Sequence, residues 1–278
     1  MSMVSLDMSP LIRPLYNVPS VVKVFDINGN AINEIELPSQ FFEPIRPDLI
    51  LRAYISALTA RLQPKGTDPM AGKRTTAVSF GIGLGIARVP RVKGSLWPTA
   101  RLAPNVVKGR RAHPPKVEKV LHERINKRER RKAIRSAIAA TAIKDLVIAR
   151  GHTVDKVPQI PLIVSDDFER ISVMADLKKS LESLGLWDDI ERVAERIRIR
   201  SGKGKMRGRR YKEGKSLLIV VSSTDASIIK VARNLPGVDV VPVRNLGVLY
   251  LAPGGVPGRL TLWTSSAIEE LRKGLFMG

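Results

Sequence analysis

The sequence contains no cysteine among its 278 residues, which excludes disulfide bridges, cysteine-bound zinc and thiol nucleophiles. Glutamine is also scarce, with only three residues. The lack of cysteine fits a cytosolic protein, and both shortages suit a thermophile that avoids labile side chains.

Long apolar runs are missing as well. No stretch approaches the ~20 apolar residues that a membrane helix needs. The best candidate, residues 137–149, is interrupted by Lys144 and Asp145. The N-terminal residues 1–14 carry Asp7 and prolines where a signal peptide has its apolar run. We therefore expect a soluble cytoplasmic chain that does not associate with a membrane.

Acidic residues are absent from residues 69–117, and the whole chain carries a net charge of +21. Residues 61–132 hold 19 basic and four acidic side chains, and residues 198–212 hold eight basic and none acidic. The other segments are close to neutral. Two cationic segments attached to a near-neutral chain indicate a polyanionic partner, and their Gly, Pro and Arg content favours nucleic acid over a membrane surface. Charge that served only solubility would be scattered and mixed in sign.

Outside the cationic segments, short apolar runs alternate with amphipathic stretches. Two strands joined by Asn28-Gly29-Asn30 are expected at residues 21–37. Further strands are expected at residues 162–164, 217–221, 238–243 and 260–263. Helices are expected at residues 47–62, 117–125, 127–151, 177–184, 190–197 and 225–235, and from residue 265 onward. This order predicts an α/β fold with a mostly parallel sheet covered by helices on both faces.

Residues 63–116 differ from the rest, because glycine and proline recur and neither helical nor strand periodicity persists. Such a composition does not bury enough apolar surface to fold alone. At ~3.3 Å per residue, an out-and-back excursion of about 48 residues reaches at most ~80 Å. The sequence therefore predicts one globular domain, residues 1–62 and 117–278, with an extended basic loop at 63–116 that becomes ordered against a partner.

Motifs of enzymes are weak or absent. Gly81-Ile-Gly-Leu-Gly85 lacks the spacing of a dinucleotide fingerprint, and the block at residues 202–211 is not closed by the Gly-Lys-Ser/Thr of a phosphate-binding loop. The acidic pairs Asp166-Asp167 and Asp188-Asp189 are explained by helix capping. We expect no catalysis, no cofactor and no metal site, the last because the three histidines are dispersed.

Several long motifs then occur in order. They are ARVPRVKG at 87–94, GRRAHPP at 109–115, INKRERR at 125–131, IRSAIAAT at 134–141, SGKGKMRGRR at 201–210, NLGV at 245–248, LAPGG at 251–255 and PGRLT at 257–261. This set resembles the universal L-four family of large-subunit ribosomal proteins in its archaeal and eukaryotic form, and it looks archaeal. The resemblance covers nearly the whole chain from Val21 onward.

The resemblance implies a structural constituent of the large ribosomal subunit that contributes to subunit assembly and translation. The implied partners are 23S-type ribosomal RNA, neighbouring large-subunit proteins and, near the loop tip, the nascent polypeptide. The loop would thread into rRNA, and its tip would help line the peptide exit tunnel. That tip is expected at Phe80, Gly81, Ile82, Gly83, Leu84, Gly85 and Arg88. Similar proteins carry Trp-Gly-Thr-Gly-Arg where this chain has Phe80 to Leu84, so a hydroxyl and a cation are replaced by aliphatic groups.

The residues expected to contact rRNA are the basic side chains of the loop, of the following helix and of the second basic block, together with Tyr211 of that block. They are Lys73, Arg74, Arg88, Arg91, Lys93, Arg101, Lys108, Arg110, Arg111, His113, Lys116, Lys127, Arg128, Arg131, Lys203, Lys205, Arg207, Arg209, Arg210 and Tyr211. Two alternatives remain open. One is an RNA-modifying enzyme on a nucleotide-binding α/β fold, and the other is a free protein that coats nucleic acid.

Overall fold

The computed structural model describes residues 18–277, so the signal-peptide expectation for residues 1–14 lies outside the described residues. The chain divides into two compact units. One, here the sheet unit, comprises the residues up to Leu58 and from Arg124, and the other, here the basic unit, comprises Thr59–Glu123. These limits lie a few residues from those predicted at residues 62 and 117.

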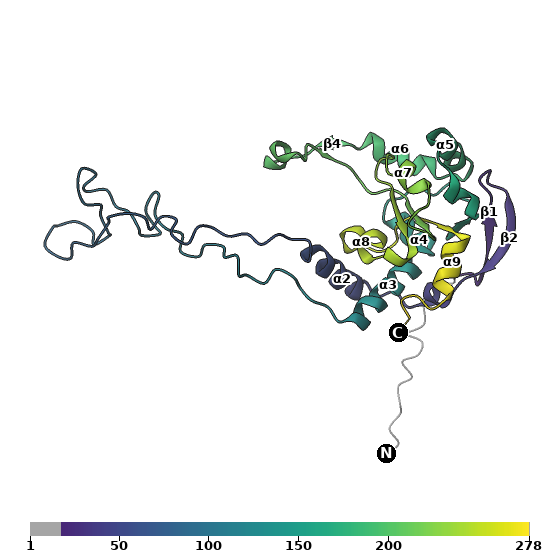
Figure 1. Cartoon of the computed structure of the whole chain (residues 1–278), viewed down its shortest axis with the longest axis horizontal. Coiled ribbons are helices and arrows are strands. Elements are labelled where there is room, and N and C mark those ends of the chain that lie inside the picture. Colours follow the sequence, from purple (N-terminus) through teal and green to yellow (C-terminus); the bar gives the residue numbers. More distant parts are fainter. Residues whose placement is uncertain (1–17, 278) are drawn as a thin grey trace, which may run out of the picture. The chain divides into compact units, whose positions relative to one another are not determined.

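A six-stranded sheet forms the centre of the sheet unit, in the order β2-β1-β3-β8-β6-β7 (Figure 1). Its strands are β1 (Val21–Phe25), β2 (Ala31–Glu36), β3 (Leu162–Val164), β6 (Leu218–Val221), β7 (Asp239–Pro242) and β8 (Thr261–Thr264). β1 and β2 pair antiparallel, and every other neighbouring pair is parallel. The predicted α/β fold with a mostly parallel sheet is confirmed.

Helices pack on both faces of this sheet. They are α2 (Pro47–Thr59), α3 (Lys127–Thr141), α4 (Lys144–Ala149), α5 (Met174–Ser183), α6 (Trp187–Glu195), α7 (Ile228–Ala232), α8 (Val248–Leu251) and α9 (Ser265–Arg272). Short 3-10 turns occur at Ser39–Phe42, Asp166–Arg170, Lys203–Arg207, Val243–Asn245 and Pro253–Gly255. Within residues 18–277, no helix combines the length and the apolar character that crossing a bilayer requires.

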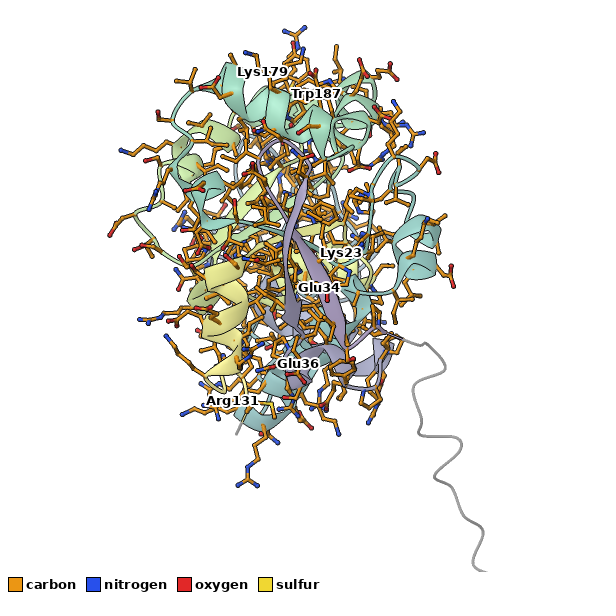
Figure 2. All side chains as sticks on the ribbon, turned by 90° about the vertical axis from the view of Figure 1, so that its right-hand side faces the viewer. Lys23, Glu34, Glu36, Arg131, Lys179 and Trp187 are labelled. Atoms are coloured by element: carbon orange, nitrogen blue, oxygen red, sulfur yellow. The ribbon has the colours of Figure 1, made fainter. Side chains whose placement is uncertain are left out.

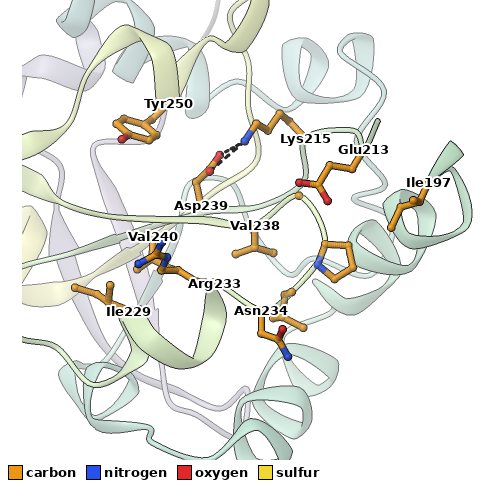
Figure 3. A pocket seen from close by; sticks show the side chains of 13 residues that line it. Ile197, Glu213, Lys215, Ile229, Arg233, Asn234, Val238, Asp239, Val240 and Tyr250 are labelled. Carbon is orange, nitrogen blue, oxygen red and sulfur yellow. Dashed lines mark hydrogen bonds and ion pairs between the residues drawn. The ribbon is translucent and has the colours of Figure 1, made fainter. Parts of the chain in front are cut away.

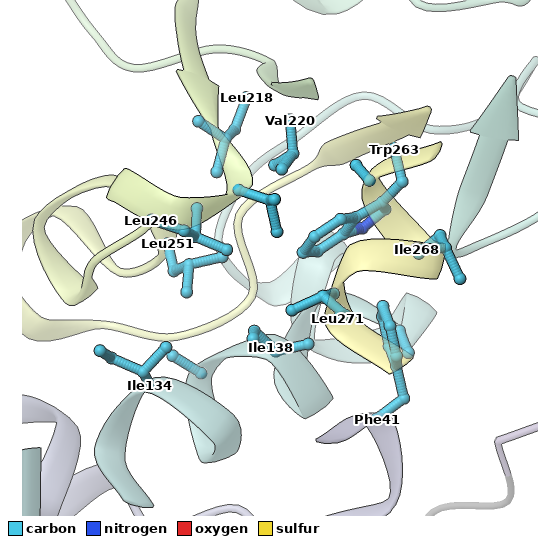
Figure 4. Close-up of a cluster of buried hydrophobic side chains, with 14 of the residues drawn as sticks. Phe41, Ile134, Ile138, Leu218, Val220, Leu246, Leu251, Trp263, Ile268 and Leu271 are labelled. Atoms are coloured by element: carbon cyan, nitrogen blue, oxygen red, sulfur yellow. The ribbon is translucent and has the colours of Figure 1, made fainter. Parts of the chain in front are cut away.

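Alternate side chains of the central strands belong to two different hydrophobic cores. Val220 and Trp263 belong to one core with Ile138 of α3 (Figure 4), whereas Ile219 and Leu262 belong to the other with residues of α5, α6 and α7. Successive side chains of a strand point to opposite faces, so a sheet covered on both sides needs apolar residues at every position. That requirement explains why β6 is a continuous run of four buried aliphatic residues.

Glycine sets two of the bends that position these elements. Gly185 ends α5 with a positive φ of 70°, and a Cβ there would lie 2.4 Å from the carbonyl oxygen of Lys156. Gly29 turns the β1–β2 hairpin with φ of 85°, and a Cβ there would lie 2.9 Å from the carbonyl oxygen of Ser183. Both sites combine a left-handed backbone with a close approach, which only glycine accommodates.

The prediction of a helix at residues 117–125 is wrong, since helical structure begins only at Lys127. Val117 and Val120 are 62% and 85% exposed, so half of the expected apolar face is not buried. The expected helix at 127–151 is two helices, α3 and α4, separated at residues 142–143. The helix expected at 225–235 is shorter, residues 228–232, and α8 was not expected.

Arg259 is the largest buried charged residue in the sheet unit, with no exposed surface. Its guanidinium donates to the backbone carbonyl oxygens of Ser216, Leu217, Gly237 and Tyr250 at 2.8–3.2 Å. Its Nη1 also lies 2.7 Å from Oδ2 of Asp239. A guanidinium has five N–H groups, and these five acceptors satisfy all of them.

A second buried network joins α6 to the start of β6. Asp189, fully buried, accepts hydrogen bonds from His152 Nδ1 at 3.0 Å, from Ser216 Oγ at 2.8 Å and from the backbone N–H of Thr153 at 3.0 Å. It also forms an ion pair with Arg192 at 2.9 Å. Burial lowers the pKa of His152, although the neighbouring carboxylate opposes this. The imidazole is therefore neutral and donates its Nδ1 proton.

Replacing Arg259 with Met is expected to lower the free energy of unfolding by about 3–5 kcal/mol, because the half-buried Asp239 loses a charged partner and four carbonyl groups lose their donor. Chemical denaturation measures this change. Arg244→Met is the control, since Arg244 pairs with Glu270 at the exposed surface and its loss should cost less than about 1 kcal/mol. Equal effects of the two substitutions would contradict the role assigned to Arg259.

The free energy of unfolding should also fall as the pH drops below the ordinary histidine pKa of about 6.5. Below that value the unfolded chain takes up a proton at His152 that the folded chain resists, because burial lowers the pKa of this side chain in the folded state. The slope for one proton is at most about 1.4 kcal/mol per pH unit. Denaturation curves between pH 7.5 and 5 measure it. His152→Asn keeps an N–H donor without titrating and should flatten this part of the profile.

Candidate nucleic-acid interface

The basic unit lacks helices and strands between Thr59 and Lys127, yet its backbone is hydrogen-bonded to itself. Val78 and Arg91 exchange two backbone hydrogen bonds of 3.1 and 3.0 Å. The N–H of Thr67 donates to the carbonyl of Pro115 at 3.1 Å. Two limbs of the unit therefore run beside each other, one outgoing and one returning (Figure 1).

The two limbs also come close together at Gly72. Its φ is 74°, and a Cβ there would lie 2.6 Å from the backbone nitrogen of Arg110. A cavity of about 410 Å³ lies beside this contact. Its charged lining consists of Lys73, Lys108, Arg110, Arg111 and Lys116, with Asp68 as the single acidic group. Because Asp68 is already paired with Arg74 at 2.7 Å, five cations surround the cavity without a carboxylate left to neutralise them.

Most of the predicted cations of this unit are exposed, namely Lys73, Arg74, Arg88, Lys93, Lys108, Arg111, His113 and Lys116, whereas Arg91, Arg101 and Arg110 are half-buried. Two of the half-buried arginines donate hydrogen bonds to backbone carbonyls of other residues in the basic unit. Arg91 donates to the carbonyls of Pro98 at 2.7 Å and Ala87 at 3.4 Å. Arg101 donates to the carbonyl of Val107 at 2.9 Å. These two side chains shape the unit, so they have less capacity for an external partner.

The predicted tip is apolar and exposed. Ile82 is 81% exposed, and Phe80 and Leu84 are also accessible. Gly81, Gly83 and Gly85 have positive φ, and nothing lies within 4 Å of a Cβ built on them. Sequence reasoning missed Trp97, whose ring makes an edge-to-face contact with Phe80 at 4.6 Å. An isolated tryptophan in a Gly- and Pro-rich segment was the signal available for it.

The second basic block forms a small hairpin, residues 198–212, here the basic hairpin. Its strands are β4 (Arg198–Ile199) and β5 (Tyr211–Lys212), paired antiparallel. The predicted residues Lys203, Lys205, Arg207, Arg209, Arg210 and Tyr211 are all exposed, and the Arg210 guanidinium lies 5.8 Å from the Tyr211 ring. Arg200, which the sequence did not single out, donates from Nε to the carbonyl of Arg209 at 3.0 Å and holds the hairpin closed.

The first turns of α3 carry the remaining predicted cations. Lys127, Arg128 and Arg131 are exposed there, whereas the following residues Ala133 and Ile134 are buried. One helix thus anchors its second half in the core and presents its basic first half to solvent.

The sheet unit offers little to the enzymatic alternative. Nucleotide phosphates bind α/β sheets at the carboxyl ends of strands, beside helix N-termini. Here Asp166 Oδ1 accepts the backbone N–H of Ser266 at 2.8 Å in the first turn of α9. Glu169 accepts the N–H of Ser222 and the hydroxyl of Thr264, both at 2.7 Å. The chain's own carboxylates occupy the places a phosphate would take.

Two other features resemble active sites without their geometry. Ser216, His152 and Asp189 match a hydrolytic triad in composition, but Ser216 donates to Asp189 and not to the histidine that would activate it. A cavity of about 660 Å³ contains the ion pair of Lys215 with Asp239 (Figure 3). It lies at the amino end of β7, whereas ligands of such sheets bind at the carboxyl ends.

Comparison with known proteins decides the family. The pattern shared by the ribosomal protein L4/L1 family matches residues 35–274. The chain belongs to this family. It is 62% identical over 273 residues to the large ribosomal subunit protein uL4 of Pyrobaculum aerophilum, covering 98% of this chain and 96% of that protein.

Two further archaeal relatives carry the same name. The large ribosomal subunit protein uL4 of Sulfurisphaera tokodaii is 55% identical, with 90% of this chain and 93% of the relative covered. That of Methanocaldococcus jannaschii is 54% identical, with 90% and 97% covered. The resemblance to an archaeal-type ribosomal protein is confirmed, and these relatives are named as ribosomal proteins, not as enzymes.

Arg91→Ala is expected to loosen the basic unit, because the variant loses the side-chain bonds to two backbone carbonyls. Trypsin should then cleave residues 73–111 of the free chain several-fold faster, by the local-unfolding argument for exposed segments. Lys93→Ala is the matched control, since Lys93 is exposed and also removes one cleavage site. Equal cleavage rates at the shared sites would remove the structural role from Arg91.

Proposed function

We propose that this chain is a structural constituent of the large ribosomal subunit, located in the cytoplasm and bound to 23S-type rRNA and neighbouring ribosomal proteins. The observation that carries the proposal is the concentration of exposed cations on the basic unit and the basic hairpin, in a chain whose relatives are named as large-subunit proteins. In this role the protein contributes to subunit assembly and translation by holding RNA segments together.

Three zones are proposed to contact rRNA. The cavity between the limbs of the basic unit, with Lys73, Lys108 and Arg110 in its lining, suits a phosphate group because its cations lack free carboxylates nearby. The exposed first turns of α3 form the second zone. The basic hairpin forms the third, where lysine and arginine neutralise phosphates and the Tyr211 ring offers a stacking face for an unpaired base.

The extended basic loop is proposed to thread into rRNA. Glycine at positions such as Gly72 lets its two limbs pass within backbone contact, which keeps the excursion thin enough for a crevice between packed RNA helices. The half-buried Arg91 and Arg101 hold its path by bonding to backbone carbonyls.

The tip at Phe80–Arg88 is proposed to help line the nascent-peptide exit tunnel. Its exposed Phe80, Ile82 and Leu84 would present aliphatic and aromatic surface to a passing polypeptide. Arg88, exposed at the end of this segment, would contact phosphate. The contact between Phe80 and Trp97 would fix the base of the tip.

Binding of the full chain to large-subunit rRNA should depend steeply on salt. Neutralising about eight to ten phosphates predicts an affinity loss of about 10³–10⁵ between about 50 and about 200 mM salt, with the duplex-DNA relation as a guide. Filter binding at several salt concentrations measures the slope. Replacing Lys203, Lys205 and Arg207 with Gln should reduce the slope by about three. A nearly flat dependence would contradict electrostatic binding.

Sedimentation of a native lysate through a high-salt sucrose gradient separates the proposal from its alternatives. Co-migration of the chain with the large subunit is expected, because an integral protein held by many phosphate contacts does not wash off. Recovery only in the soluble fractions would overturn the proposal and favour a free nucleic-acid-coating protein. Such a protein would also bind generic duplex DNA as well as rRNA.

A further inference from the structure

A cavity of the sheet unit lies between α3 and residues 274–277, which follow α9. Its volume is about 470 Å³, a size typical of ligand pockets. Figure 2 shows Arg131 of α3 at the end of the sheet unit below the yellow α9, and Lys179 of α5 at the opposite end. The side chains that line the cavity are Arg130, Arg131, Ile134, Leu275, Phe276 and Met277.

The α3 side of the cavity combines two cations with an apolar base. Residues three and four positions apart lie on the same face of a helix, so Arg130 and Arg131 are both neighbours of Ile134 on that face. Ile134 is buried, whereas both arginines are exposed. This wall therefore offers two guanidinium groups above an apolar floor.

Among residues 18–277, no carboxylate lines the cavity. Glu129, which precedes Arg130 in the sequence, is paired with Arg52 at 3.5 Å. Glu43 is paired with Arg135 at 3.2 Å. No acidic group within the lining offsets its positive charge, which favours an anionic ligand.

The opposite wall is apolar and aromatic. Leu275 and Phe276 are partly buried and pack against the core that contains Ile134. Met277 is 42% exposed. An aromatic ring and a thioether both make favourable contacts with a flat π-system, so this wall suits a planar ring better than a carboxylate or an ammonium group.

This wall is held in place by side chains from other elements. The buried Gln40 donates from Nε2 to the carbonyls of Leu271 at 2.8 Å and Leu275 at 3.0 Å. Arg135 donates from Nη1 to the carbonyl of Phe276 at 3.0 Å. A ligand would therefore meet a preorganised wall, and little binding energy would be lost in ordering it.

Phe276 occupies a backbone position that disfavours a bulky side chain. The N–H of Met277 donates to the carbonyl of Gly274 at 3.1 Å and closes a four-residue turn. Phe276, the third residue of this turn, has a φ of 66°, where glycine or asparagine is favoured. Strained residues of this kind gather at binding sites, which makes the aromatic ring at this position a candidate for ligand contact.

The combination of arginine, an aromatic ring and apolar groups is the one by which proteins bind unpaired RNA bases. The base stacks on the ring, and the guanidinium groups bind the phosphate. The cavity also continues the basic first turns of α3, which carry Lys127 and Arg128. An acidic protein segment would match the charge, but this continuity favours RNA.

We propose that the cavity between α3 and residues 274–277 binds one unpaired nucleotide of rRNA. The base lies against Phe276 and Met277, and the phosphate is held by Arg130 and Arg131. This inference rests on the proposed function, because it names the RNA feature that the α3 zone binds.

Variants of Phe276 test the base contact in filter-binding experiments with the full chain and large-subunit rRNA. Phe276→Leu keeps an apolar side chain but loses the ring, so the affinity should fall about fivefold or more. The salt dependence should stay unchanged, because no charge is removed. Phe276→Tyr keeps the ring and should bind within about twofold of the parent chain. Parental affinity of Phe276→Leu, or an equal loss in Phe276→Tyr, would overturn the proposal.

A change of charge tests the phosphate contact separately. Arg130→Gln should reduce the slope of log affinity against log salt by about one. Lys179→Gln is the matched control, since Lys179 is an exposed cation on α5 at the other end of the sheet unit (Figure 2) and its loss should leave the slope unchanged. Equal slopes for the two variants would remove the phosphate from the cavity.

Cross-linking by short-wave ultraviolet light identifies the occupant in purified, high-salt-washed large subunits. After digestion with nuclease and trypsin, mass spectrometry should find a nucleotide attached to the segment that follows Lys273. An unmodified segment, or one that a chemical cross-linker joins to an acidic protein segment, would overturn the proposal. If the chain co-sediments with the subunit in either of these cases, the proposed function stands. A chain that binds no rRNA would contradict both.

Discussion

The buried guanidinium of Arg259 is the interaction on which the arrangement of the sheet unit depends. It joins the residues before β6, the residues before β7 and the end of α8 through four carbonyl groups, and it neutralises Asp239. Asp239 also binds Lys215 at 2.9 Å, and Ser216 next to it binds Asp189 of α6 at 2.8 Å. Removing a buried charge from water is costly unless all its donors are satisfied, so these segments are held in one relative position.

That position matters because the basic hairpin leaves the fold between α6 and β6. Asp189 lies in the helix before the hairpin, and Ser216 follows it, so one buried carboxylate fixes both of its ends. A cluster of like charges repels itself, and a flexible cluster also loses entropy when it binds RNA. Rooting the hairpin in a satisfied polar network reduces the entropic part of that cost. The buried polar network therefore positions the cationic hairpin at the surface.

The sequence predicted the sheet, the two-sided helical cover and most strand positions, because apolar periodicity reports directly on burial. It failed where burial depends on tertiary contacts. Val117 and Val120 have helical spacing but are exposed, and α3 stops before α4 without a proline or glycine to mark the break. The burial of Arg259 was not predicted, since no local pattern distinguishes a buried arginine from an exposed one. Among candidate site residues, exposure of the cations was predictable, whereas the inward bonds of Arg91 and Arg101 were not.

The arginines that bond to backbone carbonyls reduce the number of cations available to bind phosphate. Arg91, Arg101 and Arg200 each donate to backbone carbonyls of the segment that contains them. In the basic unit, carbonyl oxygens are abundant because no helix or strand uses them between Thr59 and Lys127. A planar fork with five donors joins two such groups at once, which a lysine ammonium does with less geometric control. A basic segment of this kind therefore uses part of its positive charge to shape itself and only the rest to bind phosphate.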